Sequence, residues 1–492
     1  MRKPSLLVIF LTVFIDLIGF GIVLPLLPRY SERFGAEGLM IGVIIASFSV
    51  MQLFLAPFWG RLSDRIGRRP VLLLSTAGSA ASYALFAVAS SAALTATTAL
   101  WLIILSRVFA GACGANISVA SAYIADITPP EKRSKGMGLI GMAFGLGFIL
   151  GPALGALSAS SFGLAGPGWV AAGLCLTNFV LACFILAESR GPQSASAAGR
   201  PPVTQWAHLV ARPKVGLLVG IYFLSTFTFA CFESTLPLLL GSPGFHPDDF
   251  RAPHTLVKRL ATDPDPVAGA VRAHWSPAFR ETAAQADRLS PGALRRMLFA
   301  EFNRVIKAAP LDSSVTATSR DALALANRRL LERTYPAEIR PQALHFDERQ
   351  VGYLFAYCGL MSALVQGGVI GRLVKRFGEA KLIWSSLVVV AASIALIPHA
   401  QSLGILLLSL GLFSVGSGVN RAPTMGLVSI YTPAADQGAV MGLMQSAGTL
   451  ARIFGPIVAT GLWAGYPHGP FWVGGVLALL AGAFAWARLP ER

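Results

Sequence analysis

The chain has 492 residues, of which 54% are hydrophobic and only 13% are charged. A water-soluble protein of this composition would expose too much apolar surface, so the composition indicates a polytopic membrane protein. The formal net charge of +16 would suit a nucleic-acid partner, but most of the cations lie in short connections between apolar segments. The sequence shows no basic face with interleaved aromatic residues, and we therefore expect no nucleic-acid binding.

Twelve apolar segments follow one another along the chain, and each is long enough to cross a bilayer as a helix, which takes about 20 residues. The first six helices are expected at 5–28, 39–59, 71–91, 97–125, 135–158 and 168–188. The second six are expected at 214–240, 350–371, 379–398, 402–430, 437–463 and 470–488. The expected fold class is therefore an all-α polytopic membrane protein with two pseudo-symmetric bundles of six transmembrane helices.

The order of these segments predicts the domain organisation. Residues 1–189 are expected to form the N-terminal bundle, followed by a cytoplasmic linker at 190–213 that begins with a stretch rich in Ser, Ala, Gly and Pro. Helix 7 at 214–240 starts the C-terminal bundle, which resumes at 350–492. Between these two parts, residues 241–349 have a mixed, water-soluble composition and are expected to form a mainly helical insert.

Two segments of the insert have the spacing of amphipathic helices: one begins at Ser290-Pro291, and the other runs from about Asp321 to Arg333. The four histidines of the insert are scattered, without the spacing of metal ligands, and the five cysteines of the chain lie inside apolar segments. We therefore expect no metal site, no disulfide and no cofactor. The histidines are His246, His254, His274 and His345.

Positive charge in the short connections falls largely on one side of the predicted helices. Lys and Arg in short loops mark the cytoplasmic side, and Arg29 and Arg33 are exceptions on the opposite side. The even number of helices then predicts an integral membrane protein with both termini in the cytoplasm and with the insert outside. The cationic clusters lie at 2–3, 61–69, 132–135, 190–214, 372–381 and 492.

Four short patterns recur in the same order in the two sets of helices, which indicates an internal duplication. Duplicated halves around a midplane site are typical of carriers that work by alternating access. The pairs are Leu24–Leu27 with Leu236–Leu239, Gly60–Gly67 with Gly371–Gly378, Thr128-Pro129 with Thr432-Pro433, and Gly151-Pro152 with Gly455-Pro456.

Asp16 lies near the middle of the first predicted helix. An ionised carboxylate at that depth costs about 2.5–3.5 kcal/mol on insertion scales, so it must face a cavity or a cation, or stay protonated. We predict a proton-coupling role for Asp16, with Arg107 in the fourth helix as its partner and Glu233 in the seventh as a second carboxylate. A purely structural hydrogen bond or ion pair is the alternative for Asp16 and Arg107, and a place near the outer interface is the alternative for Glu233.

Two further cations lie inside the predicted tenth and eleventh helices, at Arg421 and Arg452. Either residue could bind an anionic substrate or close a gate in the C-terminal half, although a structural role is the simpler expectation. Together with Gln52, Asn116 and Gln445, these arginines are our candidates for the lining of a central cavity.

Two glycine-containing motifs complete the set of candidate sites. A dense cationic turn between the second and third predicted helices contains Gly60, Asp64, Arg65, Gly67, Arg68 and Arg69. The fifth predicted helix has small residues every three or four positions, which make a groove for another helix, and a proline that adds a bend. These residues are Gly145, Gly147, Gly151, Pro152 and Gly155.

The cationic turn resembles the signature loop between helices 2 and 3 of the major facilitator superfamily. Other stretches resemble the drug/proton antiporter branch of that superfamily, close to tetracycline-resistance-type efflux proteins. The resemblance covers both bundles and leaves the insert out. It is carried by Asp16–Pro28, Met51–Pro70, Arg107–Arg133, Gly141–Gly155, Gln437-Gly438, Gln445, Arg452 and Gly455-Pro456.

The resemblance implies alternating access that an inward flow of protons drives, with the proton gradient in place of a cofactor. It also implies that the cationic turn acts as a cytoplasmic gate, and we call its six residues the gate motif. Asp64 of this motif would latch the cytoplasmic face against the positive N-terminal end of helix 11, near Gly438. Arg107 would then take part in proton coupling, and the Gly145–Gly155 segment would be the antiporter motif. We expect a monomer in a bacterial inner membrane, whose partners are the lipid bilayer, a small-molecule substrate and protons.

The sequence also departs from this group, because tetracycline exporters are expected to carry acidic groups inside helices 3 and 9 and this chain has none there. An apolar or cationic drug-like substrate is therefore as well supported as a metal–tetracycline chelate. Our prediction is a proton-coupled exporter of small amphipathic molecules and not an enzyme. Two alternatives stay open: a metabolite or sugar symporter or facilitator of the same fold, and a membrane protein whose insert carries a signalling or binding role.

Overall fold

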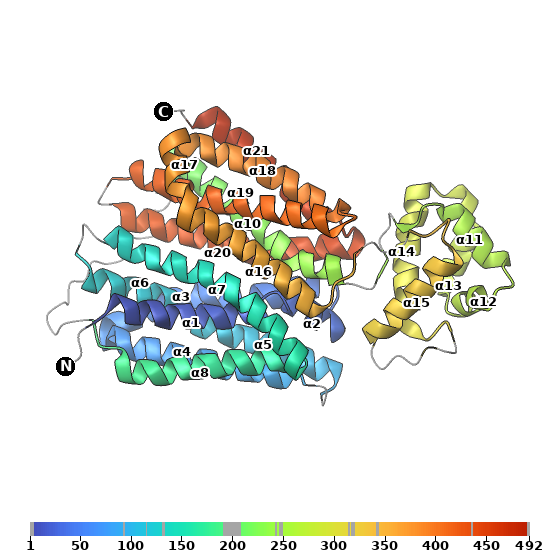
Figure 1. Cartoon of the computed structure of the whole chain (residues 1–492), viewed down its shortest axis with the longest axis horizontal. Coiled ribbons are helices and arrows are strands. Elements are labelled where there is room, and N and C mark those ends of the chain that lie inside the picture. Colours follow the sequence, from blue (N-terminus) through green and yellow to red (C-terminus); the bar gives the residue numbers. More distant parts are fainter. Residues whose placement is uncertain are drawn as a thin grey trace. The chain divides into compact units, whose positions relative to one another are not determined.

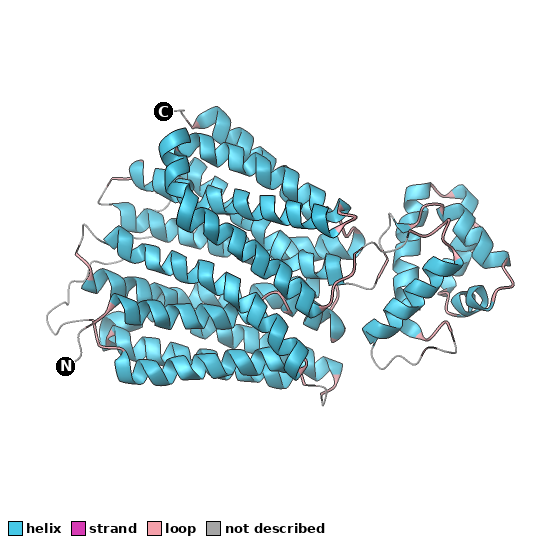
Figure 2. Cartoon of the chain, viewed as in Figure 1, coloured by secondary structure: helices cyan, strands magenta, loops and turns pink. Residues whose placement is uncertain are grey.

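The computed structural model is built almost entirely of helices (Figures 1 and 2). Among the residues that it describes, the only pairing of extended backbone is an isolated bridge between Phe250 and Ile339. Most of the predicted linker, residues 190–207, lies outside the described residues. These are 4–91, 94–114, 116–129, 133–189, 208–241, 244–245, 249–312, 315, 320–340, 344–433 and 436–489.

The N-terminal half contains six spans, two of which are interrupted by a turn. The first span breaks at Leu24–Leu26, and the fourth breaks near Gly114. The spans are α1 with α2 (Leu6–Val23, Leu27–Arg33), α3 (Leu39–Ile66), α4 (Arg68–Ala89), α5 with α6 (Ala96–Cys113, Asn116–Ile127), α7 (Arg133–Phe162) and α8 (Gly166–Ile185).

The C-terminal half repeats this arrangement, and the start of α1 and the end of α21 lie on the same side of the helical body (Figure 1). Its second span contains a π-helical turn, η4 (Val365–Val369), between α16 (Glu348–Leu364) and α17 (Ile370–Phe377). The other spans are α10 (Pro213–Gly241), α18 with η5 (Glu379–Leu396, Ile397–His399), α19 (Leu403–Ile430), α20 (Gln437–Gly465) and α21 (Gly469–Arg488).

In the described part of the chain, 11 helical stretches are long and apolar enough to cross a membrane. Helix α20, with 29 residues, is a twelfth span of comparable length. It is less apolar because it carries polar residues such as Gln445 and Arg452, which line the internal cavity described below. The predicted fold of twelve transmembrane helices is confirmed.

Two glycines at equivalent places in the two halves turn the chain sharply between two spans. Gly67 has a φ of 98° between α3 and α4, and Gly378 has a φ of 76° between α17 and α18. A side chain disfavours such positive φ values, and glycine adopts them readily. The equivalent places of the two glycines support the internal duplication.

The cationic turn predicted from the sequence is shorter than expected, and this part of the prediction was wrong. Gly60–Ile66 continue α3 and Arg68–Pro70 already belong to α4, so that Gly67 alone lies outside the helices. Hydropathy marks where a helix leaves the bilayer, whereas the backbone hydrogen bonds of the helix continue beyond that point.

Contacts divide the chain into two compact units. One unit comprises Met1–Leu238, Phe346–Ala464 and His468–Arg492, and contains the spans. The other comprises Leu239–His345 with Gly465–Pro467 and has a hydrophobic core of its own. Its helices are α11 (Pro253–Thr262), α12 (Pro266–Ala273), α13 (Pro277–Ala284), η3 (Ala286–Arg288), α14 (Pro291–Ala308) and α15 (Arg320–Thr334).

The local sequence explains several of these short helices. Asp265, Ser276 and Ser290 each cap a helix by accepting a hydrogen bond from its first turn, and a proline follows each of them at the first helical position. The two amphipathic helices predicted in the insert are confirmed as α14 and α15.

Arg328 lies in the interior of the insert, with 1% of its surface exposed. Its guanidinium pairs with Asp249 at 3.0 Å and with Glu332 at 2.7 Å. It also donates to the Gly244 carbonyl and lies 4.5 Å from the centre of the Phe245 ring. The side chain thus joins α15 to the start of the insert.

We expect Arg328→Met to destabilise the insert by about 3–5 kcal/mol, because the change removes the cation that two half-buried carboxylates face. Hydrogen exchange in the full-length protein would measure this as lost protection in α14 and α15. Arg329→Met is the control, since the neighbouring Arg329 side chain is exposed. Unchanged protection in Arg328→Met would contradict the prediction.

Candidate functional site

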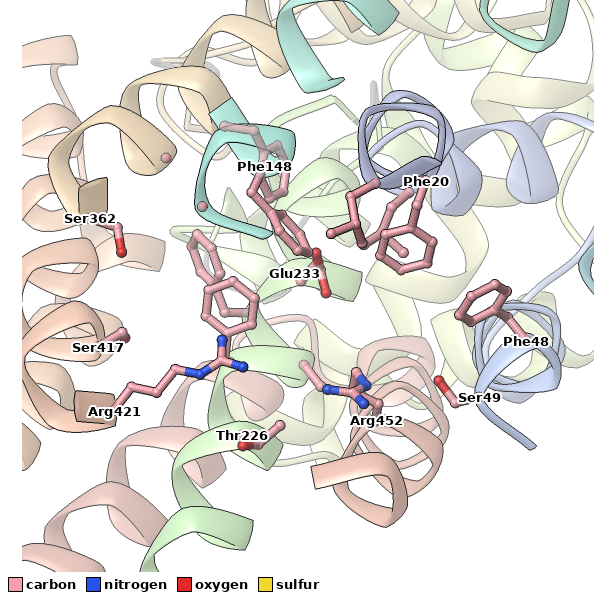
Figure 3. Close-up of a pocket in the computed structure, with 18 of the residues that line it drawn as sticks. Phe20, Phe48, Ser49, Phe148, Thr226, Glu233, Ser362, Ser417, Arg421 and Arg452 are labelled. Atoms are coloured by element: carbon pink, nitrogen blue, oxygen red, sulfur yellow. The ribbon is translucent and has the colours of Figure 1, made fainter. Parts of the chain in front are cut away.

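A cavity of about 240 Å³ lies between the two six-helix halves. Helices α1, α3, α4, α5, α6 and α7 line it from the N-terminal half, and α10, α16, η4, α18, α19 and α20 line it from the C-terminal half. The cavity lining contains both aromatic rings and charged side chains (Figure 3). This mixture is typical of sites that bind small molecules with an apolar body and a few polar groups.

Phenylalanines from both halves form an aromatic surface in the cavity. Phe20 of α1 lies 4.9 Å from Phe48 of α3, measured between ring centres, and Phe148 of α7 lies 6.4 Å from Phe229 of α10. Phe232 of α10 also lines the cavity and packs against buried Phe413 at 4.2 Å. The aromatic surface thus crosses the boundary between the halves.

Asp16 faces this cavity from α1, with 9% of its surface exposed. The Cys175 thiol of α8 lies 3.8 Å from its Oδ1 atom, within hydrogen-bonding distance for sulfur. The helix places the carboxylate toward other helices and the cavity, as an intramembrane acid requires. The position of Asp16 is therefore compatible with exchange of a proton with the cavity.

Arg107 lines the same cavity from α5 and has only 1% of its surface exposed. Its guanidinium lies 4.9 Å from the centre of the Phe48 ring and 6.0 Å from that of Phe20. Its Nε atom makes no hydrogen bond in the described structure. The cavity brings Asp16 and Arg107 together in one site, while an ion pair between them stays a prediction.

Glu233, Arg421 and Arg452 line the cavity from the C-terminal half, on α10, α19 and α20. Figure 3 shows the three side chains directed into the same space. Arg452 also donates to the Thr449 hydroxyl at 3.3 Å, and Gln445 lies in the lining nearby on α20. Glu233 was expected either to face the cavity or to lie near the outer interface, and in the structure it lines the cavity.

Gln52 and Asn116 were also predicted to line the cavity. Gln52 lines the cavity, and its Nε2 atom donates to the Gly114 carbonyl at 3.2 Å, which ties α3 to the break between α5 and α6. The side chain of Asn116 lies outside the described part of the structure.

The glycines of α7 divide into two groups. A Cβ atom built on Gly151 would lie 2.6 Å from the Cα of Gly21, and one on Gly155 would lie 2.6 Å from the Ile22 carbonyl oxygen. Gly147 meets Leu17 in the same way, at 3.0 Å. These three glycines therefore let α7 pack directly on the backbone of α1, next to Asp16.

Gly145 differs from these three, because it lines the cavity and a Cβ atom there would have no neighbour within 4 Å. The C-terminal half repeats the helix contact: a Cβ atom on Gly455, which precedes Pro456 in α20, would lie 2.7 Å from the Cβ of Ala230 in α10. The Gly-Pro pairs thus hold α7 against α1 and α20 against α10, as the duplication predicts.

The gate motif forms a compact ion-pair cluster at the ends of α3, α4 and α6. Arg68 pairs with Asp64 at 2.7 Å and with Asp126 of α6 at 3.1 Å. It also donates to the Ser63 hydroxyl at 2.6 Å, and Ser63 in turn donates to the Gly60 carbonyl. Arg68 is thus the centre of the cluster.

The first turn of α4 is anchored to the end of α8. The Glu188 carboxylate accepts the backbone N–H groups of Arg68 and Arg69 at 2.9 and 3.0 Å, as expected at a helix N-terminus. The Arg69 side chain donates to the carbonyls of Leu186 and Cys183, both at 2.8 Å. Arg65 is exposed.

The roles of Asp126 and Glu188, which hold Arg68 and the first turn of α4, were not predicted from the sequence. Asp126 lies just past the end of a predicted span and Glu188 is the last residue of another, both on the side where the arginines are concentrated. An acid at that position can pair with a gate arginine or cap a neighbouring helix, and this signal was available in the sequence.

The two halves are joined at the end of the body where Arg29 lies, which we name the Arg29 end. Arg29 pairs with Glu348 of α16 at 3.6 Å and donates to the Phe346 carbonyl at 3.4 Å. A Cβ atom on Gly42 of α3 would lie 2.6 Å from the Cα of Ile457 in α20. The gate cluster, at the opposite ends of the spans, pairs within its own half. The conformer is therefore closed at the Arg29 end.

A bundle of two duplicated six-helix halves around a central cavity defines a membrane transporter rather than an enzyme. A comparison with protein families supports this: the family described as Major Facilitator Superfamily matches residues 9–256 and 322–492. The chain belongs to the Major Facilitator Superfamily, which confirms the resemblance seen in its motifs.

Similar proteins include tetracycline resistance proteins and one solved carrier. The class E protein of Escherichia coli is 39% identical over 187 residues, 37% of this chain and 44% of that protein, so this chain spans less than half of it. The class D protein of Salmonella ordonez is 26% identical over 467 residues, 93% of this chain and 89% of that protein. The crystal structure of the human organic anion transporter MFSD10 (TETRAN) shares the fold, with a TM-score of 0.56, 24% identity and coverage of 98% and 100%.

Proposed function

We propose that this carrier exports small amphipathic molecules by alternating access, and that protons flowing inward drive the export. The observation that carries the proposal is Asp16, a carboxylate that is buried in the first span and yet lines the cavity. A carboxylate in this place can bind a proton when the cavity faces one side of the membrane and release it when the cavity faces the other.

Arg107 supplies the state-dependent partner in this scheme. A cation within about 4–6 Å favours the ionised form of a carboxylate, so a small shift of α5 against α1 would change how tightly Asp16 holds its proton. In the described conformer the guanidinium lies against the Phe48 and Phe20 rings. Movement of Arg107 between these rings and Asp16 would couple proton release to the conformational change.

The gate motif is proposed to close the opposite end of the cavity in the other conformer. Here Asp64 pairs with Arg68 and its side chain is 56% exposed. We propose that closure brings Asp64 to the N-terminal end of α20, near Gly438, where the positive end of the helix dipole stabilises the carboxylate. The Arg29 contacts would then open.

The proposal also covers the cargo, the membrane and the oligomeric state of the carrier. The relatives named tetracycline resistance proteins support a drug-like cargo, and the aromatic surface of the cavity suits one. The loop charges support both termini in the cytoplasm and the insert at 241–349 outside. The relatives from Escherichia coli and Salmonella ordonez support a bacterial inner membrane. We propose that the carrier works as a monomer, since one chain supplies both halves of the cavity.

A drug-susceptibility panel in a bacterial host that lacks its own exporters tests the proposal. Expression of the carrier is expected to raise resistance to amphipathic drugs and to lower the accumulation of a fluorescent drug in the cells. A protonophore should abolish both effects. Export that continues in the presence of the protonophore would contradict proton coupling, and an inactive panel would contradict drug export.

A further inference from the structure

Positive charge is in excess in the cavity. Three arginines (Arg107, Arg421 and Arg452) and two carboxylates (Asp16 and Glu233) line it, which leaves one positive charge when all five are ionised. The C-terminal half contributes Arg421, Arg452 and one carboxylate, Glu233, to the lining. Charges at membrane depth are costly unless opposite charges compensate them, so an added anion would complete the charge balance of this half.

The geometry of the two C-terminal arginines suits such an anion. Arg421 reaches the cavity from α19 and Arg452 from α20, and both guanidinium groups point into the same space (Figure 3). They are close enough to repel each other electrostatically, and Arg452 also interacts with Glu233. A guanidinium group matches a carboxylate or sulfonate with two parallel hydrogen bonds, and an anion between the arginines would remove their repulsion.

An aromatic surface lines the same cavity as this charged site. Phe148 and Phe229 belong to it, with ring centres 6.4 Å apart, and the Ser362 and Ser417 hydroxyl groups also line the cavity. An aromatic ring can therefore lie against the phenylalanines while an acid group attached to it reaches the arginines.

We propose that the cavity binds organic anions, that is, carboxylates or sulfonates on an aromatic body, with the acid group between Arg421 and Arg452. Glu233 is the counter-ion of Arg452 in the empty carrier, and the incoming anion replaces it. This inference rests on the proposed function, because it names the substrate class of the same cavity. It replaces the apolar or cationic drug-like cargo that the sequence left open.

Binding of two matched probes to the purified full-length carrier in lipid nanodiscs tests this inference. The probes are 2-naphthoate and its neutral amide, 2-naphthamide, which share a ring system and differ in charge. Calorimetry is expected to show saturable binding of 2-naphthoate that is at least about tenfold tighter than that of the amide. Arg421→Gln and Arg452→Gln should each weaken 2-naphthoate binding by about 10- to 100-fold, the value of a charge-assisted hydrogen bond.

Naphthamide affinity serves as the internal control for folding, since it should be unchanged in both variants. Arg421→Lys keeps the charge and should recover part of the affinity, and Arg280→Gln, at an exposed position of the insert, should change nothing. Equal binding of the two probes, wild-type naphthoate affinity in both glutamine variants, or no saturable naphthoate binding would overturn the inference. The assay applies no proton gradient, so its result is separate from that of the export experiment.

Discussion

Replacement of Asp16 by asparagine is expected to abolish proton-driven export while the carrier still folds and inserts into the membrane. Asparagine has nearly the same shape as aspartate, and it can keep the contact to the Cys175 thiol. It cannot bind and release a proton in the relevant pH range, so the gradient no longer drives transport. In inside-out vesicles, drug uptake energised by a proton gradient should fall to the level of vesicles without carrier.

Exchange of labelled for unlabelled drug across the same vesicles should persist in Asp16→Asn, because exchange needs no net proton movement. Asp287→Asn is the matched control, since it makes the same chemical change at an exposed position of the insert. Full gradient-driven uptake by Asp16→Asn would remove Asp16 from the mechanism. Loss of exchange as well would indicate a role in substrate binding instead of coupling.

Gly151→Leu is expected to destabilise the N-terminal half, whereas Gly145→Leu on the same helix should leave its stability unchanged. At Gly151 even a Cβ atom would lie 2.6 Å from the Gly21 backbone, so leucine must push α7 away from α1. Such overpacking costs about 1–3 kcal/mol or more. At Gly145 nothing lies within 4 Å of the same atom.

The measurements are the yield of monodisperse carrier, its melting temperature in detergent, and its transport rate. Gly151→Leu should lose yield and melt several degrees lower, consistent with a loss of about 1–3 kcal/mol or more. Gly145→Leu should keep both but lose transport, because its side chain fills part of the cavity. Similar melting temperatures for the two variants would show that the α1–α7 contact does not depend on Gly151.

Hydropathy predicted the spans because a bilayer requires long apolar helices, and it failed where helices extend into water. Gly60–Ile66 carry the charges of an aqueous segment and still continue α3. The break at Leu24–Leu26 contains Pro25, and the π-helical turn at Val365–Val369 contains two glycines. These residues weaken a helix without changing its hydropathy much, so the hydropathy pattern did not locate the interruptions.

The charged part of the site was predictable, and its aromatic part was not. Asp16, Glu233 and Arg452 stand out in the sequence because charges are rare in membrane spans, and all three line the cavity. Phe148 and Phe229 looked the same as lipid-facing phenylalanines, since both surroundings favour apolar side chains. Only the assembled helices distinguish the two.

The closure at the Arg29 end has an energetic consequence for how the carrier changes state. Its ion pair joins Arg29, whose side chain is 9% exposed, to Glu348, whose side chain is 28% exposed, at 3.6 Å. The partly exposed carboxylate leaves this pair open to screening by salt. Two close helix contacts add dispersion forces that salt does not screen. One is the contact of α3 with α20 at Gly42, and the other is the contact of α16 with α7 at Gly352, where a Cβ atom would lie 2.8 Å from the Pro152 carbonyl oxygen. Added salt is therefore expected to weaken only the ionic part of the closure.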